Sequence, residues 1–440
     1  MKINLLYKNI AILGFKKEGN STLRFLQKNG IKDGNITILD QNKDLKVENF
    51  NGKIITGNNY LKNLDQYDYI FKSPGISIYT NNLEYLKNKI LTQAKIFFEY
   101  YDKKIIGITQ TKGKSTTATL VYNLLKNSGY NVKLVGNIGN PVLDEIDLEK
   151  DEYDFVVYEL SSYMLDDLDN YKSYISIFGN IFPDHIDWHK NFENYFNAKK
   201  NILKNSENIL VGLDLYPKIK KDLLNRNFLT FGESGAYYSH IGKDYYINNE
   251  KILSLNPKIP GNHNLINIAG ILGVCDIVGI DKLIFIRTIN EFEGLNHRLK
   301  NLGEFNQITF IDDAISTTPE STIEAIKTYD QNISTIFLGG TNRGYNFEIL
   351  ALEIEKQGID NIVLFPDSGK EILKYLKKGN YNILETSSMS DGVKFALKHT
   401  KKGKICLLST ASPSYSLWEN FEEKGDLFYK EILSQYKDFK

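Results

Sequence analysis

The residues with the clearest chemical potential lie at positions 105–116, which read IIGITQTKGKST. An apolar run ends there in a Gly-Lys-Ser-Thr turn, and a segment with apolar residues at helical spacing follows. A strand, a tight glycine turn and a helix start together aim backbone N–H groups and the positive end of a helix dipole at one spot. Lys114 adds a cation for phosphates, and the hydroxyl of Ser115 or Thr116 suits Mg²⁺. The turn predicts a nucleotide phosphate site, although Ile108 stands where the full P-loop pattern has its first glycine.

Two further polar residues follow apolar runs at points where a strand is expected to end. Glu159 closes the run VVYE, and His185 follows FGNIF. Ligands of open α/β sheets bind at the carboxyl ends of the strands, so the Glu159 carboxylate beside the glycine turn suits Mg²⁺. The alternative is a strand-end charge that faces solvent. His189 lies four residues after His185, but Pro183 indicates a loop rather than a helical zinc pair.

Three other segments carry polar residues that gain meaning only in combination. Lys199, in NAKKNIL, by itself suggests a solvated lysine on a helix surface. The segment GNHNLIN places Asn264 and Asn267 on one face of a helix, and Asn262 suits its N-cap. Arg343 follows GGTN in a glycine-rich turn, a place that favours a binding role over a helix-surface role.

The elements that must position these residues alternate between strand and helix patterns almost throughout the chain. Such alternation predicts α/β domains with mainly parallel sheets. We expect three domains, over 1–95, 96–298 and 299–440. The first domain is predicted to end with helical residues at 83–94, and its strand before Gly14 resembles a weak dinucleotide-binding turn.

The composition excludes several classes of protein. A chain of 440 residues exceeds what one core supports, and a formal net charge of zero argues against nonspecific nucleic-acid binding. The two cysteines, Cys275 and Cys406, lie far apart in apolar runs, as expected for buried thiols in a reducing compartment. The N-terminal residues lack a signal-peptide pattern and no apolar run reaches the length of a membrane span, so we expect a cytoplasmic protein.

Taken in order, these segments resemble the Mur ligase family of peptidoglycan synthesis. The resemblance extends over the whole chain and rests on GKST at 113–116, GNIGNP at 136–141, YELSS at 158–162, PDHIDWH at 183–189, AK at 198–199, GNHNLIN at 261–267, GLNHR at 294–298, DDAISTTPEST at 312–322, LGGTNRG at 338–344 and NFEEKGDLF at 420–428. It implies an N-terminal Rossmann-like domain that binds a UDP-sugar, a central P-loop ATPase-type domain with a mostly parallel sheet, and a C-terminal Rossmann-like domain. The last segment, with SPGI at 73–76, favours the branch that joins glutamate, in its D form, to UDP-N-acetylmuramoyl-L-alanine through an acyl phosphate.

The resemblance implies a role for each matching residue. The UDP-linked substrate would contact Gly14, Phe15, Asp40, Gly75 and Asn137. ATP would contact Gly113, Lys114, Ser115, Thr116, Asn264, Asn267, Arg298 and Asp313. The catalytic set would be Lys114, Glu159, His185 and Lys199, with two Mg²⁺ ions held by Ser115, Glu159, His185 and Lys199 as a carbamate. The incoming glutamate would contact Thr317, Arg343, Ser414 and Phe421. The partners implied are these small molecules, without nucleic acid or membrane, and we expect a monomer.

Two positions depart from the family pattern. The family has glycine where Gln110 stands, and the D-glutamate enzymes have a lysine facing the amino-acid carboxylate where Ile315 stands. Arg343 is expected to compensate through a bidentate grip on a carboxylate. The missing lysine leaves open a ligase for L-glutamate or another amino acid, or a folylpolyglutamate-type enzyme. Outside the family, the alternative is a nucleotide-binding protein without ligase activity, which would need neither Glu159 nor Lys199.

Overall fold

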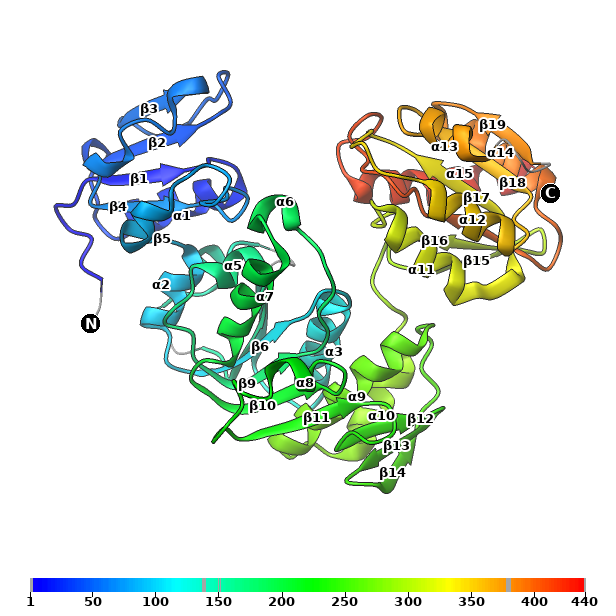
Figure 1. The fold of residues 1–440 in the computed structure, drawn as a ribbon, viewed down its shortest axis with the longest axis horizontal. Coiled ribbons are helices and arrows are strands. Elements are labelled where there is room, and N and C mark those ends of the chain that lie inside the picture. Colours follow the sequence, from blue (N-terminus) through cyan, green and yellow to red (C-terminus); the bar gives the residue numbers. More distant parts are fainter. Residues whose placement is uncertain (1–2, 137–139, 149, 151, 377–380, 439–440) are drawn as a thin grey trace. The chain divides into compact units, whose positions relative to one another are not determined.

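The computed structural model describes residues 3–136, 140–148, 150, 152–376 and 381–438. Its strands form three sheets that are mainly parallel and are flanked by helices (Figure 1). This arrangement confirms the predicted α/β class. Within the described ranges, each helix is too short or too polar to cross a membrane. The predicted substrate residue Asn137 lies outside the described residues.

The first sheet has five parallel strands in the order β3-β2-β1-β4-β5. They are β1 (Ile10–Leu13), β2 (Ile36–Asp40), β3 (Lys53–Thr56), β4 (Tyr69–Lys72) and β5 (Ile90–Leu91), and helix α1 (Lys17–Lys28) follows β1. Strand β1 pairs with β2 on one side and β4 on the other, so the sheet reverses its strand order at β1. Such a reversal opens a crevice at the carboxyl ends of the strands, where ligands bind.

The helix predicted at 83–94 is wrong. The chain forms a 3-10 helix at Glu84–Lys89, then β5, then α2 (Gln93–Tyr100). The two apolar residues of β5 are buried and form backbone hydrogen bonds with β4. They therefore belong to the sheet and not to the predicted helix. Helix α2 has its own N-cap: the Thr92 hydroxyl accepts a hydrogen bond from the Lys95 backbone N–H at 3.1 Å.

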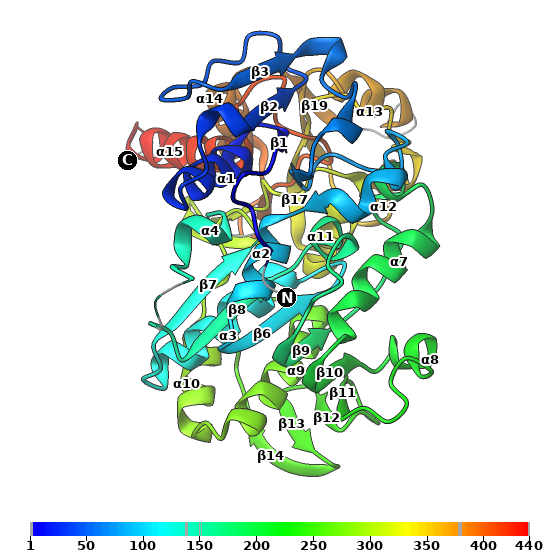
Figure 2. The same ribbon diagram turned by 90° about the vertical axis from the view of Figure 1, so that its left-hand side faces the viewer.

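The central sheet has nine strands in the order β14-β13-β12-β11-β10-β9-β6-β8-β7, which Figure 2 shows in sequence across the sheet. They are β6 (Lys104–Thr109), β7 (Val132–Gly136), β8 (Phe155–Glu159), β9 (Ser173–Phe178), β10 (Ser206–Gly212), β11 (Phe228–Gly232), β12 (Tyr238–Ile241), β13 (Asp244–Ile247) and β14 (Glu250–Ser254). The run from β7 to β12 is parallel, and β13 and β14 extend it as an antiparallel meander.

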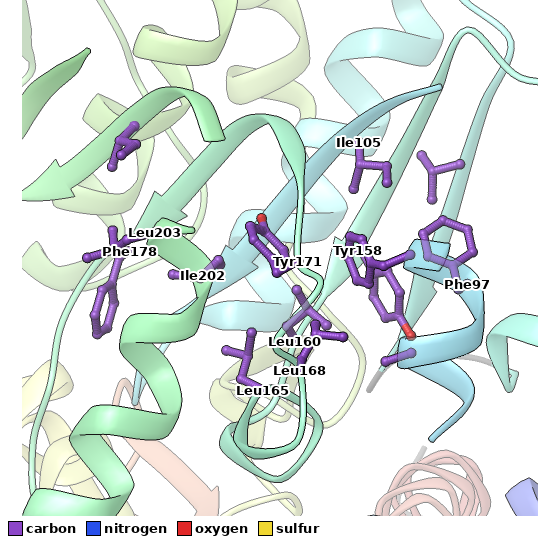
Figure 3. Close-up of a cluster of buried hydrophobic side chains, with 14 of the residues drawn as sticks. Phe97, Ile105, Tyr158, Leu160, Leu165, Leu168, Tyr171, Phe178, Ile202 and Leu203 are labelled. Atoms are coloured by element: carbon purple, nitrogen blue, oxygen red, sulfur yellow. The ribbon is translucent and has the colours of Figure 1, made fainter. Parts of the chain in front are cut away.

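Helices cover both faces of the central sheet. On one face α3 (Lys114–Asn127) packs against β7 and β8 and against α9 (Asn262–Val278) and α10 (Lys282–Glu291). The other face packs a large apolar cluster with α2, α5 (Ser162–Asp166) and α7 (Phe192–Lys200) (Figure 3). Three short helices complete this part: α4 (Val142–Glu145), α6 (Ile186–His189) and α8 (Tyr216–Ile219).

The third sheet has the order β15-β16-β20-β17-β18-β19 and is parallel except for β15. Its strands are β15 (Lys300–Phe305), β16 (Ile308–Asp312), β17 (Ile333–Gly339), β18 (Asn361–Phe365), β19 (Asn382–Glu385) and β20 (Ile405–Leu408). Its helices are α11 (Pro319–Tyr329), α12 (Glu348–Lys356), α13 (Gly369–Leu376), α14 (Met389–His399) and α15 (Phe421–Asp438). The alternation of strands and helices predicted for this part of the sequence is present.

The chain forms two compact units. The first comprises residues 1–257 and 262–291 and contains the first and central sheets, and the second comprises residues 258–261 and 292–440. The division of the first unit into domains at residue 95 stays a prediction.

Within the first unit, a buried ion pair joins the first sheet to the central one. Lys72, the last residue of β4, places its Nζ 3.1 Å from the Asp167 carboxylate, and both side chains are almost completely buried. The Lys72 ammonium also lies 5.5 Å from the ring centre of Trp188. Next to the pair, the Tyr79 hydroxyl donates to Asp166 at 2.9 Å. Burial, together with the neighbouring Asp167 charge, raises the pKa of Asp166 to about 6.

We expect Lys72→Met to destabilise the first unit by about 3–5 kcal/mol, because it leaves a buried carboxylate without its cation. The double variant Lys72→Met with Asp167→Asn should recover most of that loss, since no buried charge then remains unpaired. Urea denaturation of the three proteins measures the effect. Lys8→Met is the control, because Lys8 pairs with Asp68 at the surface and should cost at most about 1 kcal/mol. A single variant as stable as the wild type would contradict this role.

Candidate active site

The predicted strand, turn and helix are present between β6 and α3. Gly113 precedes α3 with a φ of +93°, a backbone conformation that side chains rarely adopt. A Cβ atom at Gly113 would also lie 2.5 Å from the Asn267 amide nitrogen and 2.6 Å from that of Gln110. Glycine is therefore required here both by its conformation and by the closeness of two buried amides. The turn leaves the N-terminus of the 14-residue helix α3 directed at the end of β6.

Two lysines converge on one backbone carbonyl at the end of β6. Lys114 Nζ donates to the carbonyl oxygens of Gln110 at 2.9 Å and Thr111 at 3.2 Å. Lys199 Nζ, from α7, donates to the same Gln110 oxygen at 3.2 Å and to Thr109 Oγ1 at 3.0 Å. The expectation of a solvated lysine at 199 is wrong, because the residue is only 1% exposed. Burial, aided by the nearby Lys114 charge, holds the pKa of Lys199 well below its usual range.

Glu159 lies beside these lysines as the last residue of β8. Strand β8 pairs with β6, and Glu159 lies opposite Ile108 in that register. The carboxylate is fully buried, and Ser115 Oγ donates to it at 3.2 Å. Glu159 and Asp184 both favour the charged form of Lys199, so their carboxylates lie within electrostatic reach of that lysine.

The oxygen donors at this point suit Mg²⁺, which prefers one or two carboxylates supplemented by hydroxyl, water and phosphate oxygens. Ser115 Oγ and the Glu159 carboxylate are already together at the start of α3. Among the described residues, no three His, Cys, Asp or Glu side chains form a metal cage. The donor set therefore fits a magnesium ion that shares its ligands with substrate, and it does not resemble a closed structural metal site.

The two histidines of PDHIDWH have different surroundings. His185 precedes α6 in the left-handed region, with a φ of 54°, and its ring centre lies 4.8 Å from that of Tyr163. His189 is fully buried, and its Nε2 hydrogen bonds to Ser162 Oγ at 3.0 Å. Burial lowers the pKa of His189 to about 4, so this imidazole is neutral at neutral pH. His185 is thus the exposed member, next to the turn that carries Asp184.

Asn267 connects helix α9 to the phosphate turn. Helix α9 begins at Asn262 itself, so Asn264 and Asn267 lie on one face of its first two turns. Both side chains are buried, and Asn267 Oδ1 accepts a hydrogen bond from Gln110 Nε2 at 3.1 Å. The predicted helix face is therefore present, and its asparagines point towards the interior beside β6.

A pocket of about 730 Å³ lies at the carboxyl ends of the first sheet. Three of the residues predicted for the UDP-linked substrate, Gly14, Asp40 and Gly75, line it. Phe15 contributes differently: its side chain is in the core, while its backbone N–H donates to Asp40 Oδ2 at 2.6 Å and fixes that carboxylate. Residues of the central sheet close the same pocket, among them Tyr158.

The other predicted residues belong to the second unit. Asp313 follows β16 and accepts hydrogen bonds from Ser409 Oγ at 2.7 Å and from the Leu299 N–H at 3.3 Å. Burial raises the pKa of Asp313 to about 6, although Arg298 acts in the opposite direction. Phe421 begins α15, and its ring centre lies 6.1 Å from that of His297.

The turn after β17 is joined to the turn that carries Ser414. The Thr341 N–H donates to the Pro413 carbonyl at 2.8 Å. The side-chain hydroxyls of Thr341 and Ser414 are both buried without a hydrogen-bond partner among the described residues. Arg343 is exposed two residues beyond Thr341. The two unpaired hydroxyls are neutral donors suited to a carboxylate ligand, and Arg343 adds a guanidinium to the same turn.

Sequence reasoning missed three residues of these sites. Gln110 was recognised only as a departure from the family pattern, although its side chain is buried and donates to Asn267. Nothing in the sequence indicated a binding role for Thr341, because the glycines around it indicated only a turn. Lys424 is fully buried, and its Nζ donates to Thr410 Oγ1 at 2.5 Å. Burial lowers the pKa of Lys424 to about 7, with Asp312 and Asp313 acting in the opposite direction. The apolar face of α15 around NFEEKGDLF was the available signal for that lysine.

Comparisons with known proteins agree with this geometry. The model of the Mur ligase middle domain matches residues 108–275. The UDP-N-acetylmuramoylalanine–D-glutamate ligase of Clostridium botulinum (strain 657 / Type Ba4) is 32% identical over 453 residues, which cover 96% of each chain. The ligase of the same name from Streptococcus mutans serotype c is 30% identical over 453 residues, covering 98% of each chain.

Solved structures share the fold at lower identity. The UDP-N-acetylmuramate–alanine ligase MurC of Thermotoga maritima is 18% identical with a TM-score of 0.62, covering 99% of this chain and 100% of that one. The MurF ligase of Thermotoga maritima, in complex with ADP, is 18% identical with a TM-score of 0.61, covering 97% and 95%.

We expect Lys114→Ala to weaken binding of ATP with Mg²⁺ by about 10- to 100-fold, because charge-assisted hydrogen bonds are worth about 1.5–3 kcal/mol. Isothermal titration of the purified protein measures the change. Lys112→Ala is the matched control, since Lys112 lies in the same turn but is directed to Asp184 at 3.6 Å. Equal affinities for wild type and Lys114→Ala would show that the turn does not hold phosphates.

Proposed function

Because the chain belongs to the Mur ligase family and to its UDP-N-acetylmuramoylalanine–D-glutamate ligases, we propose that it joins D-glutamate to UDP-N-acetylmuramoyl-L-alanine with ATP, in peptidoglycan precursor synthesis. The observation that carries the proposal is the similarity to these ligases over at least 96% of both chains. The grouping of Lys114, Lys199 and Glu159 at one strand end supports it, because a simple nucleotide-binding turn needs only the first. We assign the substrates to a cytoplasmic, monomeric enzyme with domains over 1–95, 96–298 and 299–440.

The reaction needs ATP because an amine does not displace oxygen from a carboxylate. The alanyl carboxylate oxygen forms a bond to the γ-phosphorus, the bond to the β-phosphate oxygen breaks, and ADP leaves. The glutamate amine then forms a bond to the acyl carbon, phosphate leaves and the amine gives up its proton. Phosphoryl transfer depends mainly on positioning and neutralisation of charge. Lys114 and the N-terminus of α3 supply both at the phosphate turn.

Magnesium would be held by Ser115, Glu159 and His185, and the first two are already in contact through Ser115 Oγ. When bound, it supplies positive charge that neutralises the phosphate oxygens. Asn264 and Asn267 would contact the nucleotide from α9, and the family resemblance implies the same role for Arg298 and Asp313. The buried Glu159 carboxylate fixes Ser115 Oγ, so the hydroxyl is already oriented at the start of α3.

We assign a carbamate to Lys199. Its buried Nζ donates to two oxygen atoms, Thr109 Oγ1 and the Gln110 carbonyl, and its lowered pKa favours the neutral amine that attacks CO₂. The nitrogen forms a bond to the carbon and releases a proton, which leaves a negative charge beside Lys114 for a second metal ion. Carbon-13 NMR in labelled bicarbonate would then show a carbamate signal that is absent from Lys199→Ala. A wild-type protein without that signal would rule the carbamate out.

The amino acid would be held in the second unit by Thr317, Arg343, Ser414 and Phe421. Arg343 is an exposed cation of the turn after β17, and Ile315 stands where the family resemblance implies a lysine. The Ile315 backbone N–H is occupied by the His297 carbonyl at 3.1 Å. A guanidinium can grip a carboxylate with two parallel hydrogen bonds, so Arg343 can take over the charge that Ile315 lacks. The comparisons favour D-glutamate over the other amino acids that this substitution leaves open.

The function is tested by phosphate release from ATP with UDP-N-acetylmuramoyl-L-alanine, Mg²⁺ and one amino acid at a time. We expect release with D-glutamate and formation of the UDP-linked dipeptide, detected by mass spectrometry. Product with L-glutamate alone would overturn the stereochemistry. Phosphate release that does not require any amino acid would support a nucleotide hydrolase instead.

Arg343→Ala should raise the KM for glutamate by about 10- to 100-fold while the KM for ATP changes little, because one charge-assisted bond is lost. The double variant Arg343→Ala with Ile315→Lys should regain part of the affinity, since a cation returns to the same site. Steady-state kinetics with each substrate varied in turn measures both. An unchanged glutamate KM in Arg343→Ala would contradict the assignment.

The affinity for the UDP-linked substrate should fall above pH 7. Glu18 lines the pocket, and burial raises the pKa of its carboxyl to about 7, although Lys72 acts in the opposite direction. The carboxyl is neutral below this pH and negative above it, where it repels the diphosphate of the substrate. We expect the KM for that substrate to rise roughly threefold or more between about pH 6 and pH 8. In Glu18→Gln the KM should not change between these pH values. If the KM of this variant rises with pH as it does in the wild type, the argument is contradicted.

A further inference from the structure

We propose that Gln110 is a positioning residue for the nucleotide site, which orients the Asn267 amide so that its amino group faces the phosphate turn. The inference rests on the proposed use of ATP. Gln110 is fully buried, directly after β6. Its Nε2 donates to Asn267 Oδ1 on α9 at 3.1 Å and to Thr117 Oγ1 on α3 at 3.2 Å. One side chain therefore ties the end of β6 to two helices of the site.

The orientation of the Gln110 amide follows from the space around it. A Cβ built on Gly179 would lie 1.8 Å from Gln110 Oε1, so this oxygen lies directly against the Gly179 backbone. An amide oxygen tolerates such contact with a Cα–H, whereas an NH₂ group would bring two hydrogens into the same space. Gln110 Oε1 has no hydrogen-bond partner among the described residues. The amide thus faces Asn267 with its donor end.

The orientation of Asn267 follows from that of Gln110. An asparagine amide that accepts a hydrogen bond through Oδ1 must direct Nδ2 elsewhere. Asn267 Nδ2 lies 2.5 Å from the position of a Cβ on Gly113, so it lies against the glycine of the phosphate turn. If the amide turned over, a carbonyl oxygen would face the turn instead of a donor. An anionic oxygen is stabilised by the first arrangement and repelled by the second.

Gln110 also joins this network to the two lysines through its backbone. Its carbonyl oxygen accepts from Lys114 at 2.9 Å and from Lys199 at 3.2 Å. These are backbone contacts, so a substitution of the Gln110 side chain leaves their acceptor in place. The side chain itself orients one neutral donor of the site, Asn267.

The test uses the full chain and direct titration with ATP and Mg²⁺. Gln110→Met keeps the size of the side chain and removes its donors. We expect nucleotide binding roughly fivefold weaker or more, the value for one lost hydrogen bond, and an unchanged KM for the UDP-linked substrate. Thr117→Val is the matched control, because it removes the other partner of Gln110 Nε2 and leaves Asn267 oriented. Its nucleotide affinity should stay within about twofold of the wild type.

A double-variant cycle separates positioning from simple structural support. If Gln110 acts through Asn267, the double variant Gln110→Met with Asn267→Ala should bind ATP as weakly as Asn267→Ala alone. Additive losses, or wild-type affinity in Gln110→Met, would overturn the proposal. If circular dichroism shows that Gln110→Met is not folded, Gln110→Gly is used instead. It also removes the Gln110 amide, and its ATP affinity is measured in the same way. Because binding is measured without the amino acid, failure of ligation with D-glutamate would count against the proposed function only.

Discussion

The site depends on two lysine side chains that converge at the end of β6. Lys114 Nζ and Lys199 Nζ both donate to the Gln110 carbonyl oxygen, and Lys199 is buried. Like charges at this separation disfavour each other strongly where water is excluded. The arrangement is stable only with negative charge nearby, which Glu159 and Asp184 provide in part. Burial and the Lys114 charge therefore favour the neutral form of Lys199, which is the form that the proposed carbamate requires.

The alternation of side chains along β8 separates this charge from the core. Val156, Tyr158 and Leu160 belong to the apolar cluster on the face of α2, α5 and α7. Glu159 has the opposite direction and meets Ser115 at the start of α3. A single strand therefore packs in the core and positions the carboxylate, and its Tyr158 also lines the pocket at the first sheet. Packing of the core fixes the position of the acid without a separate support.

Local pattern was sufficient to predict the elements, but the surroundings of individual side chains depended on distant segments. The turn at Gly113 and the strands of the third sheet follow from apolar runs and glycines. Lys199 could not be placed, because its partners Thr109 and Gln110 lie about 90 positions earlier in the chain. Lys72 was missed for the same reason, since its carboxylate partner is Asp167. The prediction of a helix at 83–94 was wrong, because strand pairing with β4 outweighed the local helical periodicity.

In the second unit, the buried and the exposed cations have different roles. Its buried Lys424 lies among Asp312 and Asp313 and tends towards neutrality, so it is poorly suited to hold an anion from solvent. Arg343 is exposed and offers a planar guanidinium that can bind a carboxylate with two hydrogen bonds. The hydroxyls of Thr341 and Ser414 add neutral donors that fix direction without adding charge. An acidic amino acid would therefore be attracted by one guanidinium and oriented by hydroxyls. In such a site Ile315 does not supply the second attraction that a lysine would give, but it also leaves no buried charge unpaired.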